Sequence, residues 1–384
     1  MHKLIRITTV PISLKVLLRG QLSFMNNKGF EVIGVSSAGE ELRDVQVSEK
    51  ISIREVNMTR TISPLADLIS LWRFYRLCKM EKPIIVHSHT PKAGIIGMLG
   101  ARLAGVPIRL HTVAGMPLME AKGVKRKILD WVEKITYSSA SKVYPNSVGL
   151  YDFILQFGYT SKEKLKVIGN GSSNGIDTSF FSREKMLDSK IQSLREALGI
   201  KEVDFVFIFV GRLVSDKGIN ELVSAFTKLN RSNIKLLLVG SLETELDPLD
   251  DDVQKIIASD PQIIKVGFQK DVRPYFAMSH ALVFPSYREG FPNVVMQAGA
   301  MGLPAIVSNI NGCNEIIIEG KNGSIIPVKN VDVIYSTLLK FIDNIDYYNS
   351  LRINARQMIT ERYEQSIVWE GLLEEYEQLL SYNK

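Results

Sequence analysis

Apolar runs and helical stretches alternate along the first half of the chain. The apolar runs are short enough for buried strands, and the stretches between them repeat apolar residues at helical spacing. The predicted strands are 4–10, 31–36, 84–86 and 108–112, and the predicted helices are 15–27, 65–80 and 91–103. Strands that alternate with helices predict a parallel sheet with helices on both faces.

The same alternation begins again after a glycine-rich polar loop at 169–177, which follows a predicted strand at 165–168. No helix opens directly after this loop, so its glycines do not match a dinucleotide-binding fingerprint. The later predicted strands are 205–210, 235–239, 263–266, 281–284 and 304–307, with a helix at 219–229. We therefore expect an α/β fold of two Rossmann-like, doubly wound domains, 1–168 and 171–365, facing a cleft. The amphipathic tail, 366–384, is expected to pack back on the first domain.

Length and composition agree with this division. A chain of 384 residues exceeds the size at which a single core stops growing, and its 45% hydrophobic and 23% charged residues are ordinary globular values. The two cysteines, Cys78 and Cys313, predict neither a disulfide framework nor a metal cluster, which suits a reducing cytosol. No apolar run reaches the length that spans a bilayer, and we expect the N-terminus to be a strand and loop and not a signal peptide.

Charge is distributed unevenly between the two halves. Residues 1–170 hold 25 Lys and Arg against 13 Asp and Glu, whereas residues 171–384 hold 22 against 28. A basic first half is compatible with an anionic membrane surface, a pyrophosphate-bearing acceptor or nucleic acid. Nucleic acid fits poorly, because no pattern of interleaved aromatic and basic residues accompanies the charge.

The segment 286–297 combines a strand end, a turn and a helix start. Glu289 lies in the turn, Pro292 is expected at the first helical position, and Asn293 and Gln297 share one helix face. A helix start binds anions through its unpaired N–H groups, and Glu289 can accept hydrogen bonds from hydroxyls. The segment therefore predicts a sugar-nucleotide site, and a helix cap with an exposed acid is the structural alternative.

A loop after the predicted strand 205–210 carries two cations, Arg212 and Lys217, between two glycines. Both could bind a diphosphate through charge-assisted hydrogen bonds. The alternative is a pair of solvated cations with Asp216 as their partner.

Histidines and acids supply further candidates. His111 is expected to leave its strand toward the cleft, with a structural, hydrogen-bonded histidine as the alternative. His87 and His89 face the same way on one strand, but no third ligand stands nearby, so zinc is not expected. The Asp-x-Asp in 250–252 precedes a helix, where acids favour the dipole, so we expect no metal there either.

A basic helix is predicted at 124–137. It combines Lys125, Arg126 and Lys127 with the amphipathic side chain of Trp131. Such a helix could lie on an anionic membrane, and the alternative is an ordinary helix with one buried face.

Taken together, these segments resemble a glycosyltransferase of family 4, the large retaining group with the GT-B architecture, and the closest similarity is to bacterial enzymes of capsule, O-antigen and lipid-linked glycan assembly. The resemblance covers nearly the whole chain. It rests on His87-Ser88-His89-Thr90-Pro91-Lys92-Ala93-Gly94, His111-Thr112-Val113-Ala114-Gly115, Asn174-Gly175-Ile176-Asp177, Gly211-Arg212-Leu213 through Lys217-Gly218, and Glu289-Gly290-Phe291-Pro292-Asn293.

The family implies roles for the matching positions. Glu289 would hold hydroxyls of the donor sugar, Arg212 and Lys217 would bind its diphosphate, and His111 would contact the transferred sugar. The family's second glutamate, which binds ribose hydroxyls, is Gln297 here. The remaining implied donor-binding positions are Gly211, Gly290, Phe291, Pro292 and Asn293, and the acceptor-binding ones are Lys15, Arg19 and Lys92.

The implied reaction is metal-independent and needs no cofactor. It transfers a hexose or N-acetylhexosamine, with retention, from a UDP-sugar to an undecaprenyl-diphosphate-linked saccharide. The resemblance also implies a cytoplasmic enzyme bound to the inner face of the cytoplasmic membrane. Two rival functions share the donor site: a sugar-nucleotide epimerase, and a non-catalytic nucleotide-sugar sensor, which Gln297 suggests.

Overall fold

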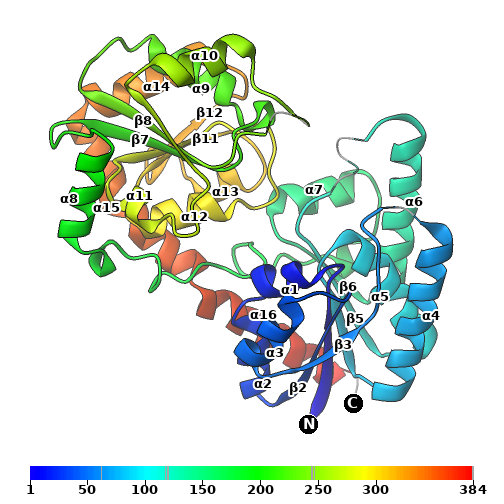
Figure 1. Ribbon diagram of the computed structural model, residues 1–384. Helices are drawn as coiled ribbons and strands as arrows, with labels where there is room; N and C mark the ends of the chain where they lie inside the picture. Colours follow the sequence, from blue (N-terminus) through cyan, green and yellow to red (C-terminus); the bar gives the residue numbers. More distant parts are fainter. Residues whose placement is uncertain (62, 117, 119–120, 244, 246, 383–384) are drawn as a thin grey trace. The chain divides into compact units, whose positions relative to one another are not determined.

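The computed structural model describes residues 1–61, 63–116, 118, 121–243, 245 and 247–382 (Figure 1). Contacts within the chain divide it into two compact units. Unit 1 comprises Met1–Gly175 with Ser366–Lys384, and unit 2 comprises Ile176–Gln365.

Unit 1 contains a six-stranded parallel sheet in the order β3-β2-β1-β4-β5-β6. This is the doubly wound order in which the chain switches direction between its first and fourth strands. The strands are β1 (His2–Ile7), β2 (Phe30–Ser36), β3 (Ser52–Glu55), β4 (Ile85–Ser88), β5 (Ile108–Val113) and β6 (Lys142–Pro145).

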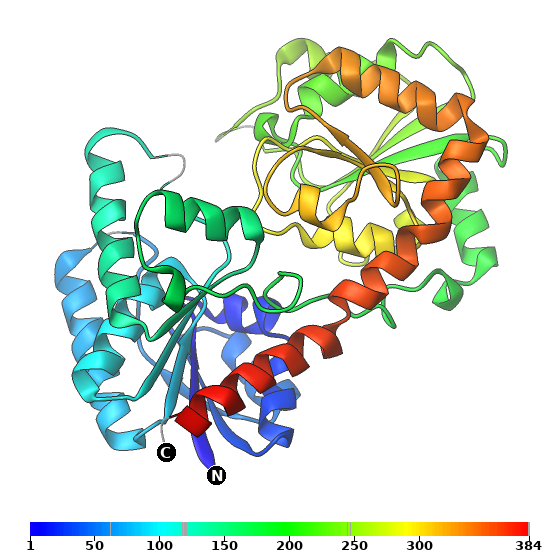
Figure 2. The ribbon, with the colours of Figure 1, turned by 180° about the vertical axis from the view of Figure 1, so that it is seen from behind.

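Helices cover both faces of this sheet because alternate strand residues point to opposite sides. Leu4 packs with one group of helices, whereas its neighbour Ile5 packs with the other. The first group is α1 (Pro11–Leu17), α2 (Gln21–Asn27), α3 (Glu41–Glu49) and α16 (Gln365–Tyr382), and the second is α4 (Pro64–Glu81), α5 (Pro91–Ala104), α6 (Gly123–Ser139) and α7 (Val148–Gln156). Figure 2 shows α16 lying along the sheet, where it buries Leu372 and Tyr376.

Unit 2 repeats the same parallel arrangement, with the order β12-β11-β10-β7-β8-β9. Its strands are β7 (Phe205–Val210), β8 (Ile234–Val239), β9 (Ile263–Gly267), β10 (Ala281–Phe284), β11 (Ala305–Ser308) and β12 (Gly323–Ile326). Its helices are α8 (Asp188–Ala197), α9 (Ile219–Thr227), α10 (Asp251–Ser259), α11 (Arg273–Ala277), α12 (Asn293–Ala300), α13 (Cys313–Ile316), α14 (Val331–Asp343) and α15 (Ile345–Tyr363). The predicted fold class, two doubly wound parallel sheets, is confirmed.

Several local predictions were wrong. The helix predicted at 15–27 is two helices, because Gly20 takes a left-handed φ of 77° with the Trp369 ring packed against it. The predicted strand at 165–168 is a single bridge between Leu165 and Val143. Edge strand β3 was not predicted, because most of its side chains are exposed and its sequence lacks an apolar run.

No helix in the described part of the chain combines the length and the apolar composition needed to cross a bilayer. Cys78 and Cys313 are both buried free thiols.

Candidate functional site

The loops that follow β7 and β10 meet in unit 2, at the point where its strand order reverses. The Tyr287 N–H donates to the Asp216 carbonyl oxygen at 2.8 Å. Gly218, with a φ of 70°, lies where a Cβ atom would be 2.2 Å from the Pro285 carbonyl oxygen, so only glycine allows this approach. Ligands of doubly wound sheets bind at this topological position, beyond the carboxyl ends of the strands.

An ion pair joins the two loops. Lys217 Nζ lies 2.6 Å from Glu289 Oε1, which also accepts a hydrogen bond from Ser286 Oγ at 3.0 Å. The two ionised side chains are only 15% and 17% exposed, so water screens them less than it screens a surface pair. A ligand with a phosphate and hydroxyls could replace each partner: the phosphate would pair with the Lys217 ammonium, and the hydroxyls would donate hydrogen bonds to the Glu289 carboxylate.

Arg212 is placed differently. Among the described residues, the Arg212 guanidinium forms an ion pair with Glu243, at 2.9 Å. About half of the Arg212 side chain is exposed. The structure therefore brings Lys217 and Glu289 together but directs Arg212 toward a neighbouring acid.

Further residues that the sequence did not single out support this site. Arg288 Nη2 lies 2.9 Å from Asp216 Oδ2, so Asp216 pairs with Arg288 and not with the two cations considered for it. The Tyr287 hydroxyl donates to Glu221 Oε1 at 2.6 Å, and burial raises the pKa of Tyr287. Arg288 and Tyr287 are adjacent to Glu289 in sequence, and that proximity was the available signal.

The loop that follows β11 also stabilises the Glu289 turn. Asn311 Nδ2 donates to the carbonyl oxygens of Glu289, at 3.2 Å, and Gly290, at 2.6 Å. The following Gly312 packs so closely that a Cβ atom would lie 2.5 Å from the Gly290 carbonyl oxygen. Nothing in the local pattern of the sequence linked this Asn-Gly pair to the turn.

Helix α12 starts one residue later than predicted, since Pro292 is its N-cap and not its first residue. No described side chain caps this end, which leaves first-turn N–H groups available to an anion. Asn293 is exposed and Gln297 is half-buried. Gly211 and Phe291 are both partly buried, and Phe291 stacks edge-on against Tyr363.

His111 does not leave its strand, contrary to the expectation. It lies within β5, where it is 3% exposed, and its Nδ1 is 2.8 Å from Ser88 Oγ. Gly94 packs directly on the ring, and burial lowers the pKa of His111 to about 4. Its surroundings are those of a neutral, hydrogen-bonded core histidine.

His87 and His89 do face the same way, and their ring centroids lie 4.2 Å apart. His87 bonds the Tyr376 hydroxyl and Thr112, whereas His89 Nε2 accepts a hydrogen bond from Arg6 Nε at 2.9 Å. Both rings take part in a buried polar network on the α16 face of the sheet.

The residues expected to contact the acceptor already have partners within unit 1. Lys15 pairs with Asp44 at 2.7 Å, and Lys92 pairs with Asp67 at 2.5 Å. Arg19 is exposed beside the loop whose Asn174 amide donates to its carbonyl oxygen.

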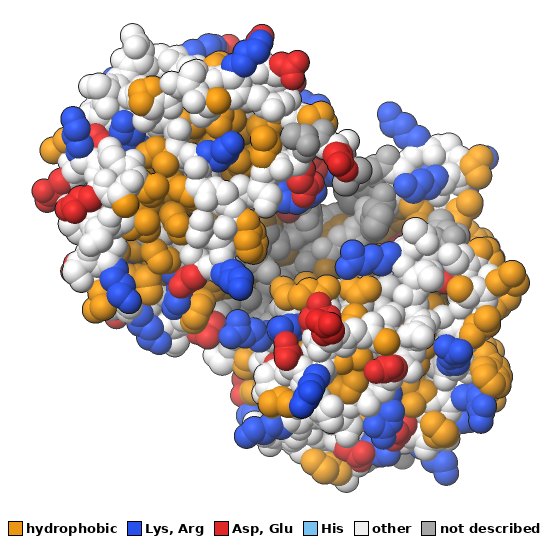
Figure 3. Space-filling view, viewed as in Figure 1, with side chains coloured by type: hydrophobic (Ala, Val, Ile, Leu, Met, Phe, Trp, Pro, Cys, Tyr) orange, Lys and Arg blue, Asp and Glu red, His pale blue; other side chains and the backbone are white. Residues whose placement is uncertain are grey.

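Helix α6 exposes an apolar and basic surface. Trp131 is 66% exposed and Val124 is 75% exposed, and Lys125 and Lys127 are exposed beside them. Arg126 instead pairs with Asp130 at 2.9 Å. Helices α4 and α6 both pack against α5. Helix α4 also exposes apolar side chains, which are Leu65, Leu68, Ile69 and Trp72. Figure 3 shows hydrophobic side chains over α4 with Lys and Arg side chains among them.

The Asp-x-Asp segment lies at the start of α10, with Asp250 as its N-cap. Among the described residues, no group of three or more His, Cys, Asp or Glu is arranged to hold a metal ion.

Comparison with known families matches both halves of the chain. Residues 190–358 match the family described as glycosyl transferases group 1. Residues 18–171 match the glycosyl transferase 4-like domain.

Individual proteins give the same picture. The capsular polysaccharide biosynthesis glycosyltransferase CapM of Staphylococcus aureus is 33% identical over 99% of this chain and 98% of its own length. The UDP-Gal:α-D-GlcNAc-diphosphoundecaprenol α-1,3-galactosyltransferase of Escherichia coli is 28% identical over 89% of this chain and 88% of its own. Among solved structures, HepE of Anabaena in complex with UDP superimposes with a TM-score of 0.82 at 18% identity, covering 98% of this chain and 100% of its own.

Proposed function

Because this chain belongs to the group 1 glycosyltransferases, with a glycosyl transferase 4-like first domain and a GT-B fold, we propose that it transfers a hexose or N-acetylhexosamine to a lipid-linked saccharide in surface polysaccharide synthesis. The donor is a UDP-sugar and the acceptor carries undecaprenyl diphosphate. The name of the E. coli galactosyltransferase supports both assignments. The name of CapM supports the role in surface polysaccharide synthesis. The observation that carries the proposal is the Lys217–Glu289 pair at the strand-order reversal of unit 2.

In this proposal the donor separates that pair. Glu289 accepts hydrogen bonds from hydroxyls of the donor sugar, and Lys217 binds the diphosphate. The uncapped start of α12 adds N–H donors, and Arg212 moves from Glu243 to the same diphosphate. Gln297, one helical turn farther along α12, bonds the ribose hydroxyls through its amide.

The reaction proceeds with retention and without a metal ion. Lys217, Arg212 and the α12 amides stabilise the negative charge that develops on the departing diphosphate. The acceptor hydroxyl attacks from the face that the diphosphate leaves, and the bond between the anomeric carbon and the diphosphate breaks as the new glycosidic bond forms. The acceptor proton passes to the leaving phosphate oxygen. His111 lies too deep in unit 1 to contact the donor sugar without rearrangement, so we assign it a supporting role.

The enzyme acts at a membrane surface, which it contacts through α6 and α4. The exposed Trp131 and the apolar side chains of α4 enter the interface, while Lys125 and Lys127 approach anionic headgroups. This association is peripheral, and it places the lipid-linked acceptor beside unit 1.

One assay tests the proposal. The purified protein is incubated with a panel of UDP- and GDP-sugars, with and without an undecaprenyl-diphosphate-linked N-acetylhexosamine, and products are identified by mass spectrometry and NMR. We expect an α-linked product that forms only when the acceptor is present. Its rate of formation should not change when a chelator removes metal ions. Conversion of the donor without acceptor would instead establish the epimerase, and binding without any turnover would establish the sensor.

A further inference from the structure

Two ion pairs join the loops that follow β7 and β10, and they are adjacent. Asp216 pairs with Arg288, and the next residue on each loop, Lys217 and Glu289, forms the second pair. Both pairs link positions that are 72 residues apart. The parallel strands β7 and β10 lead into the two loops in the same direction, so successive residues of one loop meet successive residues of the other.

The signs of the four charges favour this register over its neighbours. The first loop carries an acid and then a base, whereas the second carries a base and then an acid. A slip of one position would bring Asp216 to Glu289, or Lys217 to Arg288, and each of these combinations joins like charges. The side chains of Asp216, Lys217 and Glu289 are only 18%, 15% and 17% exposed, so water would screen that repulsion weakly.

The Asp216–Arg288 pair is also tied to the loop backbones. Arg288 donates to Asp216 Oδ2 through both Nε, at 3.2 Å, and Nη2, at 2.9 Å. The Asp216 carbonyl oxygen accepts from the Tyr287 N–H at 2.8 Å, and the Asp216 N–H donates to Asp247 Oδ2 at 2.7 Å. Asp216 therefore holds the Glu289 turn through its side chain and through its backbone at the same time.

A donor that enters between Lys217 and Glu289 removes one of these two charged links. The Asp216–Arg288 pair is then the ion pair that still joins the two loops. Arg288 is one residue from Glu289, and Asp216 is one residue from Lys217, so this link acts directly beside the groups that hold the ligand. A ligand that must reach both groups at once binds best when their separation is fixed in advance.

We propose that Asp216 and Arg288 are positioning residues of the donor site. Their ion pair keeps the two loops in register while the donor separates Lys217 from Glu289, and neither residue touches the donor. The identity of the ligand rests on the proposed function, whereas the register of the loops is a property of the free protein.

Binding is measured by isothermal titration calorimetry with UDP, UDP-glucose, UDP-galactose, UDP-N-acetylglucosamine and UDP-N-acetylgalactosamine. The proteins are the wild type, Asp216→Ala, Arg288→Ala and the double variant. Each single variant should weaken the tightest UDP-sugar by about three- to tenfold and UDP by less than about twofold, because UDP has no sugar that must also reach Glu289. The double variant should bind no more weakly than either single variant, since both remove the same contact.

The matched control is Arg231→Ala, which breaks an exposed ion pair with Asp343 in the same unit and should leave binding unchanged. Circular dichroism verifies that every variant folds. Weakening by Arg288→Ala alone would show that Arg288 binds the donor directly, and tighter binding by Asp216→Ala would show that its carboxylate only repels the diphosphate. Either result would overturn the proposal, as would losses that multiply in the double variant or unchanged affinity in both single variants.

A second measurement needs no ligand. The variant Glu289→Gln removes the charge that pairs with Lys217, as the bound donor would neutralise that pair. Hydrogen exchange of the 286–290 amides should stay slow in this variant and become about three- to tenfold faster when Arg288→Ala is added, because the Tyr287 N–H then loses its fixed partner. Equal exchange in the two proteins would overturn the proposal. If the wild type binds none of the UDP ligands, the proposed donor site fails, while hydrogen exchange still decides whether Asp216 and Arg288 hold the loops.

Discussion

The two units share one strand order but differ in how they hold polar side chains at the matching strand ends. In unit 2 these side chains form ion pairs that are partly open to solvent, as with Lys217 and Glu289 or Arg212 and Glu243. In unit 1 the equivalent position is occupied by buried, neutral histidines bonded to Arg6, Ser88 and Tyr376. Partly exposed ion pairs can exchange a protein partner for a charged ligand at little cost, whereas the buried network supports neutral hydrogen bonding. The same topology thus carries partly exposed ion pairs in one unit and a buried, neutral hydrogen-bond network in the other.

The largest expected effect concerns the ion pair of unit 2. Replacing Glu289 with glutamine keeps the shape of the side chain but removes the charge that pairs with Lys217. In the proposed donor complex this charge also orders the sugar hydroxyls. We expect turnover to fall by about 10²–10³ while the thermal midpoint changes little. The control is Asp343→Asn, which breaks the exposed ion pair to Arg231 elsewhere in unit 2 and should leave turnover unchanged. Near-normal turnover of Glu289→Gln would refute the assignment of the donor site.

Acid should destabilise unit 1 more than unit 2. His87, His89 and His111 are buried in unit 1 with lowered pKa values, whereas unit 2 has only His280. A histidine whose folded pKa lies below its unfolded pKa binds protons more readily when unfolded, so stability is lost as the pH falls below about 6.5. For His111, with a folded pKa of about 4, the loss reaches about 3 kcal/mol.

Glu133 opposes this trend. Burial raises the pKa of Glu133 to about 7. Its contribution to the free energy of unfolding is therefore present at low pH and is lost as the pH rises from about 4.5 to 7. The destabilisation from three histidines is larger than the opposing effect of one carboxyl group.

All three tryptophans, Trp72, Trp131 and Trp369, lie in unit 1, so their fluorescence reports on its unfolding, while circular dichroism reports on both units. The urea midpoint from fluorescence should therefore fall more between pH 7 and pH 5 than the urea midpoint from circular dichroism, which averages the two units. Equal shifts of the two midpoints would contradict the prediction.

Membrane contact should also distinguish the units. Removing two exposed cations near the start of α6, in the double variant Lys125→Ala and Lys127→Ala, should lower partitioning onto phosphatidylglycerol vesicles by about tenfold or more. The matched control is Lys265→Ala with Lys270→Ala, two exposed lysines of unit 2. Flotation at low and high salt measures both, and binding that ignores salt or the α6 substitutions would exclude this surface.

The smallest expected effect is at Gln297. A carboxylate accepts hydrogen bonds from ribose hydroxyls more strongly than an amide does, so Gln297→Glu should tighten UDP binding by about threefold to tenfold. Isothermal titration calorimetry measures this, with the exposed Gln378→Glu in unit 1 as control. Weaker binding by Gln297→Glu would show that the amide is the preferred ribose partner here.

Sequence alone identified the doubly wound fold, because the alternation of apolar runs and helical spacing is local and repeats in both halves. It also located the Glu289 turn and the Lys217 loop, since each directly follows a strand that an apolar run had already predicted. Strand β3 was not predicted, because most of its side chains are exposed and its sequence contains no apolar run.

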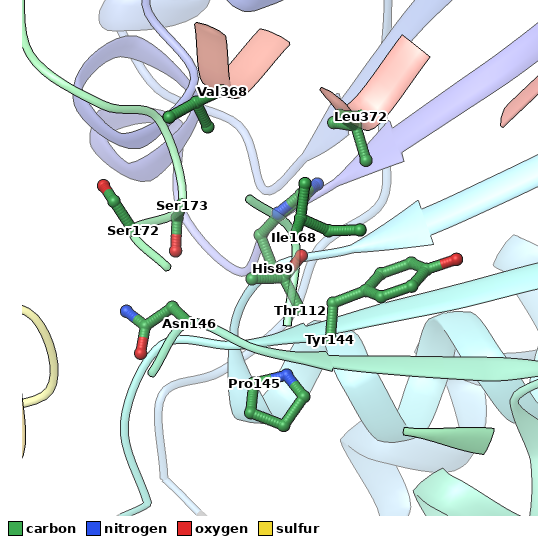
Figure 4. A pocket seen from close by; sticks show the side chains of 10 residues that line it. All are labelled: His89, Thr112, Tyr144, Pro145, Asn146, Ile168, Ser172, Ser173, Val368 and Leu372. Atoms are coloured by element: carbon green, nitrogen blue, oxygen red, sulfur yellow. The ribbon is translucent and has the colours of Figure 1, made fainter. Parts of the chain in front are cut away.

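Only the tertiary structure decided which polar residues meet. Lys217 and Glu289 are 72 positions apart and pair because β7 and β10 are neighbours in the sheet. A hollow in unit 1 is lined by His89, Asn146, Ser173 and Leu372, which come from four separate segments of the chain (Figure 4). Strand periodicity is set by each residue's immediate neighbours, whereas pairing across a sheet depends on strand order and on which face a side chain takes. The fold class can therefore be predicted from the local sequence pattern, whereas the contacts that build the sites become visible only in the folded structure.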